Sequence, residues 1–327
     1  MYYIGIDLGG TNIAAGIVSE SGEILRKESI PTKNERESQL ILEDMASLVN
    51  QLIADHGIEK SEVISIGVGA PGTANAREGK IAYANNLKFE NVDIRGVVGG
   101  LTGLPVFVDN DANCAALAES EAGAAKGTAC SVTITLGTGV GSGIISEGKI
   151  YSGFNNLAAE FGHTLLIMDG EQCTCGRKGC LEAYASGTAL IRQTIEAGKA
   201  HPESLITACA KEGKLENTSA RTAFDAARQG DAIAQEVVDR YIKYVGEGLV
   251  NLINAFSPEV VCVGGGISNE GENLLKPIRE YVYARIYAHS ISETLVPKSK
   301  IVKALMGNDA GIIGAAMLGK NVSPCAD

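Results

Sequence analysis

Four side chains with metal-ligating atoms lie close together in the middle of the sequence. His163, Cys173, Cys175 and Cys180 have the spacing H-x9-C-x-C-x4-C, and such a donor set suits tetrahedral zinc. Four protein ligands would close the site, so the zinc is predicted to be structural and not a Lewis acid. A core histidine beside buried free thiols, or redox chemistry, is the alternative. The three cysteines fall within eight residues, which favours zinc.

Two glutamates flank this cluster. Glu160 lies three residues before His163, and Glu182 lies two residues after Cys180. A zinc-braced loop would fix both carboxylates, and paired acidic side chains can accept hydrogen bonds from adjacent sugar hydroxyls. The alternative is that both are solvated surface residues. Glu182 would then be one of the acidic residues that commonly occur at a helix N-terminus.

A carboxylate suited to base catalysis lies in the segment Asp109-Asn110-Asp111-Ala112-Asn113. This segment follows an apolar strand and opens a helical run. A carboxylate held rigidly there can act as a general base toward an alcohol, and we predict that Asp111 has this role. Helix capping is the alternative, but it explains one polar residue better than four within five positions.

Glycine turns occur twice in similar surroundings. The segments 6–17 and 134–145 each read as an apolar strand, a Gly/Thr turn and a second strand. Such turns expose backbone N–H groups that suit phosphate oxygens. A plain hairpin is the alternative for one copy, and the duplication favours a ligand-binding role. The turns are Gly9, Gly10 and Thr11 in the first copy, and Gly137, Thr138 and Gly139 in the second.

The two copies differ at one informative position. Asp7 stands in the first copy where Thr135 stands in the second, so only the first could bind hydrated Mg²⁺ through a carboxylate. A third glycine cluster, Gly264, Gly265 and Gly266, follows the strand 260–263. Because ligands of α/β sheets settle beyond the carboxyl ends of strands, we expect this turn beside a nucleotide base or ribose.

The elements that must position these residues form an α/β pattern. Strands are expected at 63–68, 106–108, 260–263 and 300–304. Helical patterns cover 40–53 and 232–253, and further helices begin near Ala112, Leu181, Asn273 and Asp309. The repeat predicts two related lobes with a cleft between them. We place the first at 1–111, joined by a last helix at 307–320, and the second, with the zinc loop, at 112–306.

Composition excludes some classes of function. The net charge of −11 and the lack of a basic run argue against a nucleic-acid partner. No apolar segment is long enough to span a membrane, and the N-terminus does not read as a secretion signal. Eight cysteines without such a signal suggest a reducing compartment. A cytoplasmic protein is therefore expected.

Taken together, these motifs resemble the ROK family of bacterial sugar kinases and related repressors, within the actin-like ATPase superfamily of ribonuclease H-like folds. The resemblance covers nearly the whole chain. It is carried by the segments Asp7–Thr11, Gly69–Gly72, Asn85–Leu87, Asn110–Asn113, Leu136–Gly139, Glu160–His163 and Cys173–Glu182.

The resemblance implies a set of roles. Asp111 would be the base acting on the sugar hydroxyl, and ATP–Mg²⁺ would lie over the Asp7 and Thr138 turns, with adenosine near Gly264–Gly266. It also implies a homodimer. Ala159 departs from the family, which usually has glycine before the glutamate, so a small shift in that loop is expected without loss of activity. The residues expected around the hexose are Gly69, Asn86, Asn110, Glu160, His163 and Glu182.

The substrate and the class of protein have alternatives. Glucose, phosphorylated at O6, is the leading substrate because the cysteine block looks most like that of glucokinases. Kinases of N-acetylmannosamine, N-acetylglucosamine, allose or fructose stay open. A sugar-responsive repressor would carry a helix-turn-helix domain before the first glycine turn, which begins within ten residues of Met1. A filament or chaperone ATPase would not need a zinc-fixed sugar pocket.

Overall fold

The computed structural model describes residues 1–287 and 289–320. The chain forms two compact units. The first comprises 1–133, 143–159 and the C-terminal stretch from Ala304, and the second comprises 134–142 and 160–303. Two of the four boundaries between the units pass through the strands β9 (Cys130–Leu136) and β10 (Val140–Ser146).

The first sheet has the strand order β3-β2-β1-β4-β8. Strand β1 pairs antiparallel with β2 and parallel with β4, which in turn runs parallel to β8. The carboxyl ends of β1, β4 and β8 therefore lie at the same edge of the sheet. The strands are β1 (Tyr2–Leu8), β2 (Asn12–Ser19), β3 (Ile24–Pro31), β4 (Val63–Ala70) and β8 (Val106–Asn110).

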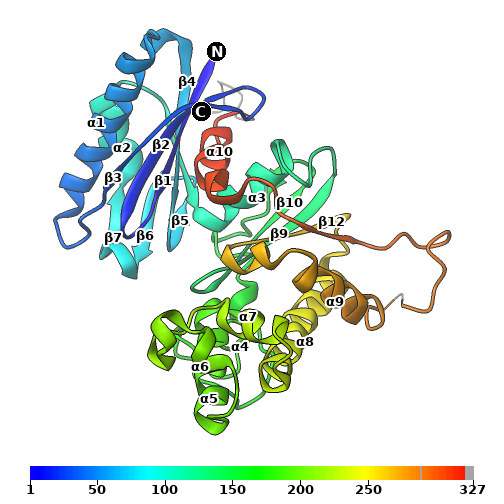
Figure 1. The fold of residues 1–327 in the computed structure, drawn as a ribbon. Coiled ribbons are helices and arrows are strands. Elements are labelled where there is room, and N and C mark those ends of the chain that lie inside the picture. Colours follow the sequence, from blue (N-terminus) through cyan, green and yellow to red (C-terminus); the bar gives the residue numbers. More distant parts are fainter. Residues whose placement is uncertain (288, 321–327) are drawn as a thin grey trace. The chain divides into compact units, whose positions relative to one another are not determined.

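Both faces of this sheet are covered by helices. Alternate residues of a strand point to opposite faces, so Ile4 and Ile6 pack in the cluster shared with α1 (Ser38–His56) and α2 (Ile94–Thr102), whereas Tyr3 packs in the cluster shared with α3 (Asp111–Glu121) and α10 (Ala310–Met317). Figure 1 shows α1 and α2 on one side of these strands and α10 on the other. The edge carrying Asp7 is thus held between two packed layers.

Glycines on neighbouring strands let α10 lie directly on the sheet. Gly5 and Gly67 are paired across β1 and β4, and a Cβ atom at either would overlap the carbonyl oxygens of Ile312 or Ala315 on α10. The close approach exists only because these two positions lack side chains. It brings the start of α10 against the end of β1.

A small three-stranded sheet carries one of the predicted sugar ligands. Its order is β5-β6-β7, with β5 at Thr73–Asn75, β6 at Lys80–Ala84 and β7 at Phe89–Asp93. The short 3₁₀ turn Asn85–Leu87 connects β6 to β7 and presents Asn86.

The second large sheet repeats the design of the first. Its order is β11-β10-β9-β12-β13, so a three-strand meander is followed by two more strands in the same succession as β3-β2-β1-β4-β8. Strands β12 (Val260–Gly264) and β13 (Lys300–Lys303) run parallel, and β11 covers Lys149–Ile150. The predicted repeat is therefore confirmed.

The long helix α8 (Ala232–Phe256) of the second unit packs against four other helices, α4, α5, α7 and α9. Helix α8 buries Tyr241, whose hydroxyl donates to the carbonyl oxygen of Ala185 at 2.9 Å. The strands and helices expected from the sequence are all confirmed within a few residues. The helices are α4 (Glu182–Ala185), α5 (Gly187–Ala200), α6 (Ile206–Cys209), α7 (Thr222–Arg228), α8 (Ala232–Phe256) and α9 (Glu272–Tyr283).

Within the described residues, helices long and apolar enough to cross a lipid bilayer are absent.

Candidate active site and metal centre

Two carboxylates of the first unit stand at the ends of β1 and β8, on either side of β4. Asp7 on β1 is paired with Gly69 on β4, and Gly69 is paired with Asp109 on β8, so the three residues form one row across the sheet. The space above Gly69 is filled by Cys114, because a Cβ atom at Gly69 would lie 3.0 Å from its Sγ. Burial raises the pKa of both Asp7 and Asp109.

Asp111 is the first residue of α3, immediately after β8. The cap of this helix is Asn110, whose Oδ1 accepts from the N–H of Ala112 at 2.8 Å and whose Nδ2 donates to the carbonyl oxygen of Gly72 at 3.0 Å. Capping is thus done by the neighbouring asparagine, while Asp111 Oδ1 accepts from Ala112 N–H at 2.9 Å. The structure places Asp111 at the same sheet edge as Asp7.

Asp109 holds the turn between β8 and α3 in place through hydrogen bonds, a role that we did not predict. Its side chain is only 8% exposed. Its Oδ1 accepts from the N–H of Asn110 at 2.7 Å and from Nδ2 of Asn113 at 2.8 Å. The residues on both sides of Asp111 are therefore tied to one buried carboxylate.

The first glycine turn joins β1 to β2 and lies beside Asn86. Gly9 N–H donates to the carbonyl oxygen of Asn12 at 2.9 Å, and a Cβ atom at Gly10 would lie 3.6 Å from the carbonyl oxygen of Asn86. The hydroxyl of Thr32 fixes the turn by donating to Gly9 O at 2.7 Å. Thus Asp7, Gly69, Asn110 and Asp111 share one sheet edge, and Asn86 adjoins the glycine turn.

The buried charge of Asp7 gives a stability prediction. A carboxylate whose folded pKa is raised destabilises the fold above that pKa, and the penalty disappears as the pH falls through the folded pKa toward the unfolded value. Asp7→Asn, measured without nucleotide or Mg²⁺, is therefore expected to increase the free energy of unfolding at neutral pH by about 1 kcal/mol. Thermal unfolding at a series of lower pH values should show this gain shrinking. A variant less stable than wild type at neutral pH would contradict the prediction.

In the second unit, the turn between β9 and β10 is held by its surroundings. Gly137 accepts at its carbonyl oxygen from the N–H of Gly187 at 2.7 Å, and the hydroxyl of Thr188 donates to Thr138 O at 2.8 Å. Both contacts come from the start of α5. The turn Gly137–Gly139 is thus held in place at two of its carbonyl groups.

The third glycine turn lies against the same strand. Gly265 has φ +81°, a left-handed backbone that glycine adopts without strain, and a Cβ atom there would overlap the backbone of Leu136 at the end of β9. The structure thus brings Gly264–Gly266 and Gly137–Gly139 together within one unit.

The cysteine and histidine side chains converge as predicted. The ligand atoms of His163, Cys173, Cys175 and Cys180 all lie within 4.8 Å of one another. Cys173 Sγ is 3.7 Å from His163 Nδ1, and Cys175 Sγ is 3.7 Å from Cys180 Sγ. These distances and donor types fit one tetrahedral ion, and zinc is the metal that such donors prefer.

The thiols of this centre differ in acidity. A hydrogen bond from the backbone of Arg177 lowers the pKa of Cys175, whereas burial raises the pKa of Cys180 to about 12. Buried thiols of this kind ionise when a cation takes the place of the proton. The three thiols and the imidazole thus form a donor set that could hold a metal ion.

The two predicted glutamates have different surroundings. Glu160 is exposed, and its carbonyl oxygen accepts from the N–H of His163 at 3.0 Å. Glu182 is the first residue of α4, and its Oε2 accepts from the backbone N–H of Val140 at 2.9 Å. Ala159, just before Glu160, has φ +68°, which explains physically why glycine suits this position.

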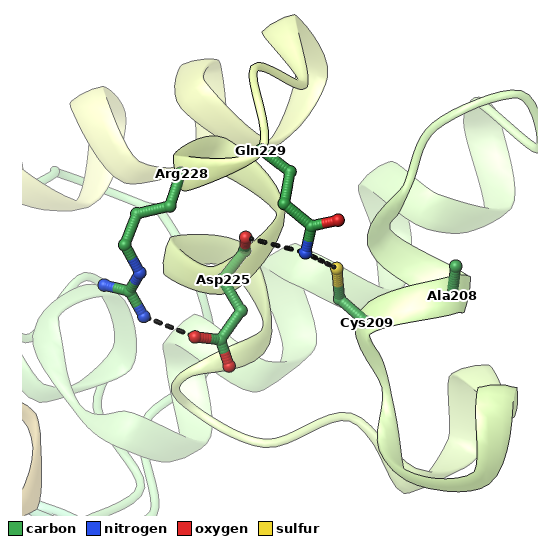
Figure 2. A pocket seen from close by; sticks show the side chains of 5 residues that line it. All are labelled: Ala208, Cys209, Asp225, Arg228 and Gln229. Atoms are coloured by element: carbon green, nitrogen blue, oxygen red, sulfur yellow. Dashed lines mark hydrogen bonds and ion pairs between the residues drawn. The ribbon is translucent and has the colours of Figure 1, made fainter.

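A cavity of about 440 Å³ in the second unit is lined by other residues (Figure 2). Figure 2 shows Arg228 bonded to Asp225, and Gln229 bonded to Cys209. Arg228 also pairs at 2.6 Å with Glu270, which is 9% exposed and ends the 3₁₀ turn Gly266–Glu270. The cavity wall therefore braces the segment after the third glycine turn. The cavity is lined by Ala208, Cys209, Asp225, Arg228 and Gln229.

Together, two sheets of the same strand order, each with a glycine turn between its first two strands along the chain, define a protein of the actin-like ATPase fold class. The family model described as "ROK family" matches residues 3–322. The chain belongs to the ROK family.

Individual relatives match over almost the whole chain. A glucokinase of Halalkalibacterium halodurans is 40% identical over 98% of this chain and 95% of its own length. An N-acetyl-D-glucosamine kinase of Aliivibrio fischeri is 35% identical over 97% and 99%. A crystal structure of a ROK family glucokinase from Streptomyces griseus, in complex with glucose and AMPPNP, has a TM-score of 0.81 at 35% identity and covers 98% of this chain and 100% of that one.

Proposed function

We propose that the chain transfers the γ-phosphoryl group of ATP to the 6-hydroxyl of a hexose, with glucose as the preferred acceptor. The broader activity is that of an ATP-dependent sugar kinase, shared by relatives that match the chain from end to end. The observation that carries the proposal is the edge of the first sheet. There Asp7, beside the first glycine turn, and Asp111, at the start of α3, are fixed by the ends of β1 and β8, the two strands that flank β4.

The proposed chemistry is in-line displacement. The bond from O6 to the γ-phosphorus forms as the bond from that phosphorus to the β,γ-bridging oxygen of ATP breaks, and Asp111 accepts the proton of O6. Catalysis rests mainly on position and on charge stabilisation. Bound Mg²⁺, held through Asp7, would supply positive charge beside the phosphates.

The remaining residues have proposed binding roles. The triphosphate would contact Gly9, Gly10, Thr11, Gly137, Thr138 and Gly139, and adenosine would lie beside Gly264, Gly265 and Gly266. The hexose would contact Gly69, Asn86, Asn110, Glu160, His163 and Glu182. Zinc bound by His163, Cys173, Cys175 and Cys180 would brace the loop that carries the sugar ligands, and we also propose a homodimer.

A coupled assay of ADP release over glucose, N-acetylglucosamine, N-acetylmannosamine, allose and fructose tests the proposal. Glucose is expected to give the highest kcat/KM, with glucose 6-phosphate as product. A higher kcat/KM for N-acetylglucosamine would favour the second candidate, which the Aliivibrio relative supports. ATP turnover that no sugar accelerates would contradict a kinase of either kind.

A further inference from the structure

One side chain joins the metal centre to the turn between β9 and β10. Glu182 Oε2 accepts from the backbone N–H of Val140 at 2.9 Å, and its Oε1 accepts from the hydroxyl of Thr174 at 3.1 Å. Val140 follows the turn Gly137–Gly139 directly, and Thr174 lies between the ligands Cys173 and Cys175. The carboxylate therefore contacts the glycine turn with one oxygen and the cysteine loop with the other.

Both backbone polar groups of Val140, its N–H and its carbonyl oxygen, are closely packed. A Cβ atom at Gly139 would overlap Oε2 of Glu182, so glycine is needed for the carboxylate to reach the N–H of Val140. The carbonyl oxygen of Val140 lies against Gly162, where a Cβ atom would overlap it, and Gly162 precedes the metal ligand His163. The peptide groups on either side of Val140 are thus both held by segments that carry the metal ligands or adjoin them.

We propose that metal binding at the cysteine and histidine cluster and nucleotide binding at the turn Gly137–Gly139 are thermodynamically linked through Thr174 and Glu182. The inference rests on the proposed function, which places phosphates at this turn. It gives Thr174 a positioning role, and it gives Glu182 a role separate from any contact with sugar.

The physical basis is the cost of ordering the chain. A metal bound by Cys173 and Cys175 fixes Thr174 between them, so the hydroxyl keeps Glu182 in place under Val140. Without the metal, the cysteine segment gains conformational freedom, and a phosphate ligand must then pay part of the entropy of ordering the turn. Because linkage is reciprocal, nucleotide must tighten metal binding by the same factor.

Calorimetric titration of the full-length chain with MgADP, in the absence of sugar, measures this linkage. Zinc-loaded wild type is expected to bind MgADP about tenfold more tightly than chelator-treated wild type, and MgADP should tighten zinc binding by the same factor, measured by competition with a chromophoric chelator. Thr174→Val removes only the hydroxyl and should reduce both factors to about twofold. Thr174→Ser keeps the hydroxyl and should retain the wild-type factor.

Equal MgADP affinity of zinc-loaded and zinc-free wild type would overturn the inference, as would a Thr174→Val variant with the full wild-type factor. If circular dichroism shows that zinc-free protein is unfolded, zinc-loaded Thr174→Val and Thr174→Ser are compared directly. The valine variant is then expected to bind MgADP about fivefold more weakly, and equal affinities would overturn the inference. Absence of MgADP binding to zinc-loaded wild type would instead remove the proposed function itself.

Discussion

Asp111→Asn is expected to lower kcat for hexose phosphorylation by about 10³-fold, because a positioned general base contributes roughly 10²–10⁴-fold to such a reaction. Asparagine has the same shape but cannot accept the proton of O6. Affinity for the sugar, measured by calorimetry, should change little, since an amide still bonds to a hydroxyl. The loss should therefore appear in kcat and only weakly in KM.

Asp93→Asn is a matched control for this variant. Asp93 also lies between a strand and a helix, as the cap of α2, and its carboxylate accepts from the N–H of Gly96 at 2.9 Å. Asparagine caps helices as well as aspartate does, so turnover should stay within about twofold of wild type. If Asp111→Asn were as active as Asp93→Asn, Asp111 would have no role as the base.

Removal of the metal is expected to have the second largest effect. Structural zinc contributes directly to folding, and Cys175→Ser removes the most exposed of the three thiols, so little core packing is lost with it. The midpoint of thermal unfolding should fall by about 10 °C, the change expected for a few kcal/mol in a unit of this size. Hexose turnover should be lost in parallel, because Glu160 and Glu182 flank the loop.

Cys209→Ser separates this effect from the general loss of a thiol. Cys209 is half-buried on α6 and accepts from Nε2 of Gln229 at 3.1 Å, a contact that a hydroxyl can keep. Metal analysis should find one zinc per chain in wild type and in Cys209→Ser, and much less in Cys175→Ser. A zinc-free wild type of undiminished stability would remove the structural role of the metal.

The cluster of cysteine and histidine side chains and the repeated turns could be predicted because their signals are local. Soft ligands at short spacing can surround one ion with little help from distant segments. The turns Gly9–Thr11 and Gly137–Gly139 are recognisable because each lies between two apolar strands, and the strand order of the two sheets confirms the duplication.

Contacts between segments that lie far apart in the sequence have no comparable local pattern in the residues. The last helix is expected to join the first lobe, but the contacts that hold it there were not predicted: α10 packs on β1 and β4 where glycines permit it, and the buried carboxylate of Glu119 accepts from the N–H of Met306 at 2.8 Å. Hydrophobic patterns show that Gly5 and Gly67 lie in strands, but not which helix they meet.

The residues that support the site were equally hard to predict from the sequence. Asp109 stands within a motif that drew attention to Asp111, yet its bonds to Asn110 and Asn113 depend on the geometry of the β8–α3 turn. Thr174 is a single hydroxyl residue between two cysteines, and its bond to Glu182 follows from how the cysteine segment folds back. The sugar and nucleotide roles of the predicted residues stay predictions until ligands are bound.

A crystal structure with glucose and a non-hydrolysable ATP analogue would test the central claim most directly. We expect a carboxylate oxygen of Asp111 about 3 Å from O6 of the sugar, within hydrogen-bond reach of the proton that it accepts, and O6 facing the γ-phosphorus. A sugar bound with O6 beyond the reach of Asp111, while the analogue occupies the glycine turns, would contradict the account.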